Sequence, residues 1–348
     1  MLTHGHAVSA LQRSLLNAIP PDSALGSGTQ TSVWDWRKGG AIQPIAINAS
    51  SLELYLNPYQ FGEAIYCDIQ HLMNHATEHR ARLVSGISLN TDPSPSWTFV
   101  TTYYWALFIS LTISRFRNKI ILFLDKDSVQ AISAEIPGRA LGGGVFRISV
   151  GDFETTSRRR AELKKAKSGH FHDVVWNDIY ALAQAFVVEL ELISKSRRLS
   201  DDELLDLRAF RCFTNVRFRE PHAWQSTLRN AVNYRHGFSY RSVINSNIIN
   251  LAQLVSRPSQ GTFEKLVEAC EAVVSDLKAT NDPLDAPGAS AQLVMYQALI
   301  LDCYCRAVMK SFCQARGVTQ EIAKERADFL TLYGAVGSTN LLLPMIEY

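Results

Sequence analysis

The chain has 348 residues, of which 47% are hydrophobic and 10% aromatic, so it can bury a substantial core and is not a disordered protein. Its formal net charge is +2 at pH 7, too small to identify a nucleic-acid-binding protein, so any electrostatic binding surface must be local. The six cysteines lack zinc-site spacing and predict the reduced core thiols of a cytoplasmic protein.

The first 57 residues predict an irregular N-terminal arm. Residues 5–19 have the pattern of a short amphipathic helix that ends at Pro20 and Pro21, and a loop rich in Gly, Ser and Thr follows. Residues 33–57 are β-like or irregular, with an alternating pattern in Leu52–Leu56. The N-terminus has no basic region followed by an apolar run, so we expect no secretory signal.

Two helices are predicted next, at about 59–83 and 95–116. The most apolar stretch of the chain, Trp97–Ile113, lies in the second helix. It is short for a membrane span and carries five serine and threonine residues, so a buried helix is expected and membrane association is not.

Three histidines of the first helix, His71, His75 and His79, repeat at i, i+4 and i+8. This spacing can hold zinc on one helix face. However, the glutamate of an H-E-x-x-H arrangement is missing, and the third position drifts around the helix. A surface stripe is the favoured interpretation, with no metal site and no cofactor.

A small β insertion is predicted near residues 118–152. Its strands are Lys119–Leu124 and Gly144–Val150, and each has a β-typical apolar pattern. The glycines at 142–144 are not followed by Gly-Lys-Ser/Thr, so they predict a turn and not a phosphate-binding loop.

The most basic part of the chain follows this insertion. It contains the cations Arg158, Arg159, Arg160, Lys164 and Lys165. One interpretation is a surface that follows an RNA backbone, with the nearby aromatic and histidine residues stacking on bases. The other is a solvated loop or helix that connects the insertion to the rest of the chain.

From about residue 174 onward every long segment has helical periodicity. The predicted helices are 174–197, 201–217, 222–236, 241–256, 261–280, 290–315 and 319–334. Ser200 and Glu203 form a capping-box pattern, and Thr319 is the expected cap of the last helix. The predicted fold is therefore mainly α, with an N-terminal arm at 1–57 and a helical domain at 58–348 that contains the β insertion.

The predicted helix 222–236 carries the strongest functional signal. Arg229 and His236 are seven positions apart, which is two helical turns, so they point the same way about 10 Å apart along the axis. Asn233 lies between them on this face, and Asn230 follows the arginine, while apolar residues gather on the opposite face. A guanidinium, an amide and an imidazole on one face suit a phosphodiester.

The spacing alone is weak evidence. A second pair, Arg217 and His222, has similar spacing, but Pro221 lies between its members and would break a helix. What favours the first pair is its amphipathic segment and Gly237 directly after the histidine. The alternative is a surface helix whose polar face happens to contain an arginine and a histidine.

The string from Leu228 to His236 resembles the signature of the HEPN superfamily, in which an arginine is followed by a polar residue and, four to six positions later, by a histidine. The aromatic segment from Phe99 to Leu111 is similar to the tyrosine-rich core helix of HEPN-like bundles, including the YaaC-like group. The resemblance covers about residues 58–250 and implies a HEPN-like helical bundle with a small β insertion.

The resemblance also implies a function: a metal-independent endoribonuclease that acts as the effector of a bacterial toxin or antiphage defence system. Arg229 would hold the scissile phosphate, because guanidinium is always charged and binds in a bidentate manner. His236 would transfer the proton, and Asn230 and Asn233 would orient the pair. Arg235 is either a second phosphate ligand or a cation whose stem packs on the buried side.

Acid–base cleavage generally needs two proton-transfer groups, and one motif supplies one histidine. A homodimer with two motif helices across a two-fold axis would supply both. The alternative to a nuclease is a non-catalytic HEPN-like scaffold or regulatory subunit of a larger defence complex, with a protein partner encoded in the same operon. A ligand sensor that uses the β insertion and its glycine-rich turn is a third interpretation.

Overall fold

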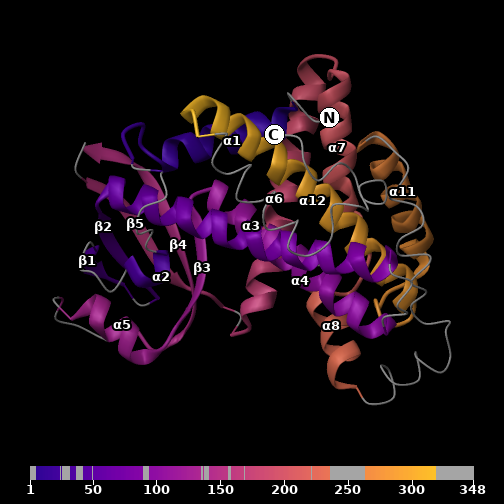
Figure 1. The fold of residues 1–348 in the computed structure, drawn as a ribbon, viewed down its shortest axis with the longest axis horizontal. Helices are drawn as coiled ribbons and strands as arrows, with labels where there is room; N and C mark the ends of the chain where they lie inside the picture. Colours follow the sequence, from indigo (N-terminus) through magenta and orange to yellow (C-terminus); the bar gives the residue numbers. More distant parts are fainter. Residues whose placement is uncertain are drawn as a thin grey trace.

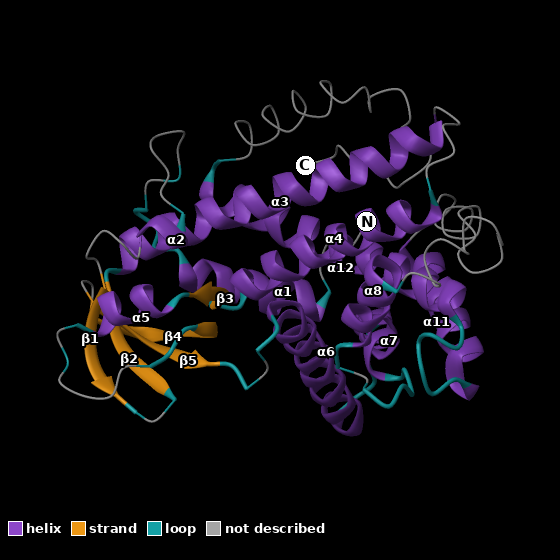
Figure 2. Ribbon diagram, turned by 90° about the horizontal axis from the view of Figure 1, so that it is seen from below, coloured by secondary structure: helices purple, strands orange, loops and turns teal. Residues whose placement is uncertain are grey.

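The computed structural model is mainly helical, with one five-stranded antiparallel sheet. The residues it describes are 5–23, 25, 32–36, 42–48, 50–88, 94–134, 136, 141–155, 158–167, 169–220, 222–235 and 263–318. The sheet lies at one end of the molecule, at the left of Figures 1 and 2, and most of the helices lie to its right.

The described helices agree with the predicted ones to within a few residues, apart from the short α2 and α5, which the sequence did not predict. They are α1 (His6–Ala18), α2 (Val33–Trp36), α3 (Pro58–Ser88), α4 (Pro95–Phe116), α5 (Lys126–Ser133), α6 (Phe171–Ser196), α7 (Asp201–Thr214), α8 (Trp224–Tyr234), α11 (Phe263–Asp276), the 3-10 turn η2 (Leu277–Ala279) and α12 (Pro287–Arg316). The helices predicted at 241–256 and 319–334, with the cap at Thr319, lie outside the described residues.

Helix α4 is the central helix, as its apolar sequence predicts. It packs against α3, α6, α8 and α12, and the side chains of Phe99, Tyr103, Trp105 and Phe116 are fully buried. The buried hydroxyls of Thr102, Ser110 and Thr112 donate to carbonyls four residues earlier in α4, as Thr102 does to Thr98 at 2.9 Å, so they need no partner from another helix. Among the described helices, none combines the length and the apolar run that crossing a bilayer requires.

The sheet is larger than the predicted insertion. Its strands are β1 (Ile42–Ile47), β2 (Ser51–Leu56), β3 (Lys119–Leu124), β4 (Gly144–Thr155) and β5 (Arg158–Lys165), in the order β1-β2-β5-β4-β3. The β-like alternation in Leu52–Leu56 is confirmed, but an irregular arm is wrong for residues 42–47 and 51–56, because β1 pairs with β2 and β2 pairs with β5 in the same sheet. Leu52 and Leu54 lie opposite Leu163 and Ala161, and all four are buried.

The basic segment is the central strand β5 and not a loop or a helix. Its side chains alternate, so that Arg159, Ala161 and Leu163 are buried while Arg158, Arg160 and Lys164 are exposed. A strand with one buried face usually alternates apolar and polar residues. Here the alternation is hard to see in the sequence, because Arg159 occupies one of the buried positions.

Arg159 is consequently not available for RNA, contrary to the prediction. It is 1% exposed and donates to the carbonyls of Gly151 at 2.6 Å, Asn17 at 2.9 Å and Ala18 at 3.1 Å. Two of these carbonyls belong to the last turn of α1, where a cation is favourable. Arg159 therefore attaches α1 to the sheet.

The glycine-rich turn forms close backbone contacts, in agreement with its prediction as a turn. A Cβ atom on Gly143 would lie 2.9 Å from the backbone nitrogen of Lys126. The Lys165 ammonium donates to the carbonyl of Gly142 at 3.1 Å. Lys165 thus contacts this turn, whereas the neighbouring Lys164 side chain is exposed on the other face.

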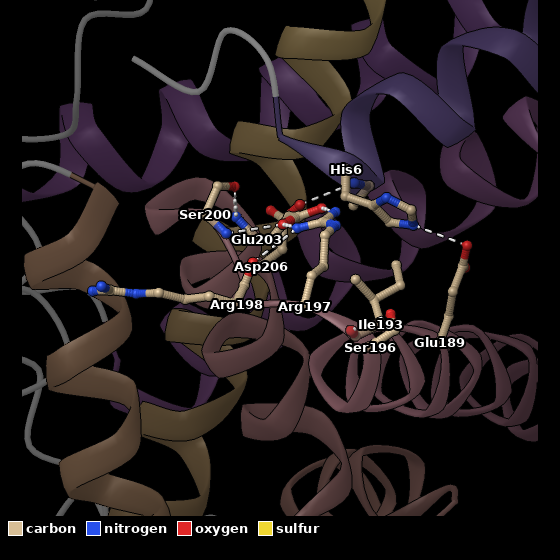
Figure 3. Close-up of polar contacts among 10 residues, drawn as sticks. His6, Glu189, Ile193, Ser196, Arg197, Arg198, Ser200, Glu203 and Asp206 are labelled. Carbon is tan, nitrogen blue, oxygen red and sulfur yellow. Dashed lines mark hydrogen bonds and ion pairs between the residues drawn. The ribbon is translucent and has the colours of Figure 1, made fainter.

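A polar cluster fixes the start of α1, and we call it the amino-terminal corner. Figure 3 labels His6, Glu189, Arg197, Ser200, Glu203 and Asp206, and the corner also includes Ala7 and Tyr304. The buried Asp206 carboxylate accepts from Ala7 N at 2.9 Å and from Tyr304 Oη at 2.7 Å. It thereby caps α1 from another helix, since Gly5 at the N-cap has no side chain. Gly5 is also needed for space, because a Cβ there would lie 2.8 Å from Asp206 Oδ2.

The rest of the corner stabilises the start of α7. Ser200 and Glu203 form the predicted capping box, and Arg197 donates to both oxygens of Glu203 at 2.7 and 2.5 Å. The Arg197 hydrogen bonds lower the pKa of Glu203 to about 2. His6 Nε2 lies 3.0 Å from Glu189 Oε1 but makes no hydrogen bond within the described residues.

Candidate functional site

Helix α8 has the amphipathic character that its sequence predicts. Its buried face includes Trp224, Leu228, Ala231 and Val232, while Asn230 and Asn233 are exposed. Gln225 contributes a buried hydrogen bond of 3.1 Å to Gln297 of α12. Apolar packing and this bond fix the rotation of α8, and with it the direction of the Arg229 side chain.

The helix ends earlier than predicted. Tyr234 is its last residue, and Arg235 has an extended backbone with φ −88° and ψ 103°. The predicted span of 222–236 is therefore too long, because α8 is Trp224–Tyr234. His236 and Gly237 lie outside the described residues.

Arg229 points toward helix α4. Its Nη2 donates to Tyr104 Oη at 2.5 Å, and its Nη1 donates to Asn230 Oδ1 at 3.0 Å and to Tyr234 Oη at 3.5 Å. The guanidinium carbon lies 5.5 Å from the ring centroids of both tyrosines, which is within cation–π range. The cation is thus held between a half-buried tyrosine of α4 and an exposed tyrosine of its own helix.

A histidine that the sequence did not single out as catalytic lies beside this arginine. The Nδ1 atom of His172, in the first turn of α6, is 2.8 Å from Tyr103 Oη, and the two rings are stacked with their centroids 5.6 Å apart. The Tyr103 oxygen also accepts from Trp176 Nε1 at 3.0 Å. We call the group formed by Tyr103, Tyr104, His172 and Arg229 the Arg229 cluster.

The electrostatics of the Arg229 cluster favour a neutral imidazole. Burial lowers the pKa of His172, and the positive charge of Arg229 lowers it further, although Asp173 acts in the opposite direction. Burial also raises the pKa of Tyr103, so its phenol remains protonated. Near neutral pH the site therefore presents a fixed cation beside an uncharged histidine.

A second histidine borders the cluster from α3. The His79 ring stacks on Tyr104 and on Phe108, with centroid distances of 6.0 and 5.5 Å. Burial is the main reason that the pKa of His79 is lowered. Its Nδ1 atom is buried and has no hydrogen-bond partner within the described part of the chain.

The three histidines of α3 therefore do not form a plain surface stripe. His71 is exposed, but His75 and His79 pack on α4, where His75 stacks on Phe108 at 5.0 Å. Over the ranges that the structure describes, no three His, Cys, Asp or Glu residues are grouped so as to hold a metal ion.

The remaining predicted site residues are dispersed. Asn230 accepts a hydrogen bond from Arg229, whereas the side chains of Asn233 and Arg235 are exposed. Arg158, Arg160 and Lys164 lie on β5, in the sheet. The predicted RNA-binding residues and the predicted catalytic residues thus belong to different elements.

Sequence reasoning missed His172, Tyr104 and His79 as one group. The available signal was the pair Tyr103-Tyr104 in an otherwise apolar helix, since tyrosine hydroxyls need partners when they are buried. Nothing local identifies those partners, because Tyr103 and His172 are 69 positions apart and Tyr104 and Arg229 are 125 apart.

Comparison with known proteins does not assign this chain to a family: no family model matches it, and neither a curated protein nor a solved structure does.

Proposed function

We propose that this chain is a metal-independent endoribonuclease with a HEPN-like helical bundle, acting as the effector of a bacterial toxin or antiphage defence system. The observation that carries the proposal is the Arg229 cluster: an arginine fixed by tyrosine side chains stands beside a neutral, hydrogen-bonded histidine. RNA cleavage without metal needs a base for the 2′-hydroxyl and a cation for the charge that develops on the phosphate.

Arg229 is suited to the phosphate. Its Nε atom is buried and has no hydrogen-bond partner among the described residues, so a donor remains for a ligand oxygen. The rigid fork of the guanidinium can present Nε and one Nη to two phosphate oxygens at once. Asn230 and Tyr234, which contact Nη1, would orient this fork and complete the binding of an anion.

His172 is suited to accept the proton in one of its two tautomers. If Nδ1 carries the proton and donates to Tyr103, Nε2 is left with a free lone pair and acts as the base. The Tyr103 oxygen can accept from both Trp176 and His172, because a hydroxyl oxygen has two acceptor positions. Its own proton can then point toward Ser226, whose side chain lies beside it.

In the reaction that we propose, His172 takes the 2′-hydroxyl proton, and the 2′-oxygen attacks the phosphorus. The bond to the 5′-oxygen breaks, leaving a 2′,3′-cyclic phosphate on one fragment and a 5′-hydroxyl on the other. The leaving oxygen needs a proton from a second group. His236, as the sequence predicts, or a histidine of a second copy in a homodimer would supply it.

One observation favours the alternative, a non-catalytic scaffold or regulatory subunit. Several Arg229 donors already bond to Tyr104, Asn230 and Tyr234 of the same chain. A guanidinium used in this way stabilises the contact between α8 and α4. In that case Arg229 substitutions would reduce stability, and the chain would have no ribonuclease activity to lose.

The test is an RNA cleavage assay in EDTA with the purified full-length chain. The variants are Arg229→Ala, Arg229→Lys, His172→Asn and His236→Ala. We expect wild-type cleavage to leave cyclic-phosphate ends and Arg229→Ala to slow it at least about 100-fold. His172→Asn, which keeps a polar side chain beside Tyr103, should slow it by about 100-fold or more.

The matched control is Arg198→Ala, which removes an exposed arginine between α6 and α7. Its rate should equal that of the wild type. Cleavage that survives both Arg229→Ala and His172→Asn would contradict the proposal, as would cleavage that EDTA abolishes. If the wild type does not cleave RNA and Arg229→Ala lowers the stability of the fold, the result would support the scaffold or regulatory role.

A further inference from the structure

Four cations gather where the end of α4 meets the sheet and the start of α6. Arg117 follows α4, Lys119 begins β3, Arg147 lies in β4, and Lys164 lies in β5. We call this group the four-cation cluster. Its side chains reach solvent to different extents: Lys164 is exposed, the Lys119 side chain is 35% exposed, and that of Arg117 is 19% exposed.

The positions of these residues in the sheet force the cations together. Arg147 lies directly opposite Lys164 in the pairing of β4 with β5. Lys119 lies opposite Ser149, two residues from Arg147, so the two cations are diagonal neighbours on one face. Like charges directly across a strand pair destabilise a sheet, and a bound anion would remove that cost.

The carboxylates nearby do not balance this charge. Asp178 of α6 is buried and lies 3.6 Å from Arg117 Nη1 and 3.9 Å from Lys119 Nζ, and it accepts from Ser114 Oγ at 2.9 Å. Glu162 lies on the same face of β5, two residues from Lys164, and opposite Glu53. Glu53 is ion-paired with Arg160, so the four cations against Asp178 and Glu162 leave an excess of two positive charges.

Two guanidinium groups in the cluster have donors to spare. Arg117 Nη1 and Arg147 Nε are buried, and neither has a hydrogen-bond partner in the described ranges. Arg147 Nη2 donates to the carbonyl of Val174 at 3.3 Å, which holds its side chain against the first turn of α6. Buried donors without partners are costly, and an anion would satisfy them.

We propose that the four-cation cluster binds a phosphate group. Phosphate matches an excess of about two charges, and arginine is well suited to its oxygens. The phosphate of a single-stranded RNA is the favoured source, because two more exposed arginines lie farther along the same face of β5: Arg160, which is ion-paired with Glu53, and Arg158. Val174, which Arg147 contacts, is two residues from His172 in α6. RNA bound to the cluster would therefore pass beside the Arg229 cluster, and this part of the inference rests on the proposed function.

The test measures binding with RNA that cannot be cleaved. A fluorescent 12-nucleotide RNA with 2′-O-methyl groups lacks the attacking hydroxyl, so binding is independent of catalysis. Anisotropy is recorded at several salt concentrations for wild type, Lys119→Gln, Lys164→Glu and Lys278→Glu. Lys278 is an exposed lysine of η2, and its variant matches the charge change of Lys164→Glu at a distant surface.

We expect Lys164→Glu to weaken binding about tenfold or more near 0.1 M salt. Lys119→Gln should reduce the slope of log K against log salt by about 0.7, the value for one phosphate contact to a single strand. Lys278→Glu should bind as the wild type does. Thermal unfolding of each variant confirms that it is folded, and Lys164 is exposed, so its substitution leaves the core intact.

Two further ligands identify the source of the phosphate. Inorganic phosphate and a nucleoside triphosphate are titrated against the same proteins by calorimetry. Binding of either that depends on Lys164, without RNA binding, would support a phosphate site and assign it to a small ligand. If no ligand binds, or if Lys164→Glu and Lys278→Glu weaken binding equally, the proposal is overturned. If the wild type binds the RNA but does not cleave an unmodified RNA, the result counts against the proposed function alone.

Discussion

The amino-terminal corner and the Arg229 cluster are built from similar side chains, but they differ in how their charged groups are paired. In the corner, both oxygens of the buried Asp206 carboxylate accept a hydrogen bond, and Glu203 binds Arg197 through both of its oxygens. In and beside the Arg229 cluster, Arg229 Nε and His79 Nδ1 are buried without a hydrogen-bond partner in the part of the chain that the structure describes.

This difference distinguishes a structural role from a functional one. A buried donor without a partner costs about 1–3 kcal/mol, so stability favours pairing buried charges, as the carboxylates of Asp206 and Glu203 are paired in the corner, although His6 Nε2 there makes no hydrogen bond within the described residues. Unpaired donors next to an arginine and a histidine instead leave positions for a ligand. The comparison therefore predicts that substitutions in the corner reduce stability, whereas substitutions in the Arg229 cluster mainly reduce activity.

Asp206→Ala should have the largest effect on stability. It leaves the Ala7 N–H and the Tyr304 hydroxyl buried without an acceptor, and each such group costs about 1–3 kcal/mol. We expect a loss of about 3 kcal/mol in the free energy of unfolding, measured by urea denaturation. Asp206→Asn keeps one acceptor oxygen and should lose less. A loss below about 1 kcal/mol would show that the corner does not fix α1.

Tyr104→Phe should have a smaller effect on stability and a specific effect on activity. It removes the hydroxyl that accepts from Arg229 at 2.5 Å and keeps the ring on which His79 stacks. We expect a loss of about 1 kcal/mol in stability and a tenfold or greater loss in RNA cleavage, at about 1.4 kcal/mol per tenfold. Destabilisation as large as that of Asp206→Ala, with cleavage unchanged, would make both regions structural.

The smallest expected effect is on the pH dependence of stability, which should differ in sign between histidines of the Arg229 region and Asp206 of the corner. Burial lowers the pKa of His172 and of His79, so between the unfolded value of about 6.5 and each folded value the unfolded state binds more protons. Stability should therefore fall as the pH decreases below about 6.5. Asp206 has the opposite sign, because burial raises its pKa, and Glu203, with a pKa of about 2, loses its contribution only below about pH 4.5.

The measurement is the Tm of the wild type, His172→Asn and Ser200→Ala at pH 8, 7, 6 and 5. His172→Asn removes one titrating group and should flatten the decrease between pH 7 and 5. Ser200→Ala removes a capping residue at a cost of about 1 kcal/mol and should lower the Tm by a similar amount at each of these pH values. An unchanged slope in His172→Asn would contradict the lowered pKa of this histidine.

The sequence by itself determined the features that depend on neighbours along the chain. Helical period and the capping box at Ser200 and Glu203 placed α6, α7, α8 and α12, because these patterns repeat within one or two turns. The apolar run of α4 correctly indicated a buried helix. The amphipathic pattern of α8 also separated Asn230 and Asn233 from the apolar face, but it did not show that Arg229 contacts α4.

Only the tertiary structure decided which distant residues meet. The charges of β5 suggested a loop or a helix. Arg159 can be buried in a strand because carbonyls of α1 and β4 accept its hydrogen bonds, and no local sequence pattern reveals these partners. His172 belongs to the Arg229 cluster because α6 places it against Tyr103, which is 69 positions earlier in the sequence. Periodicity acts between near neighbours, whereas the partner of a buried polar group is set by packing between elements.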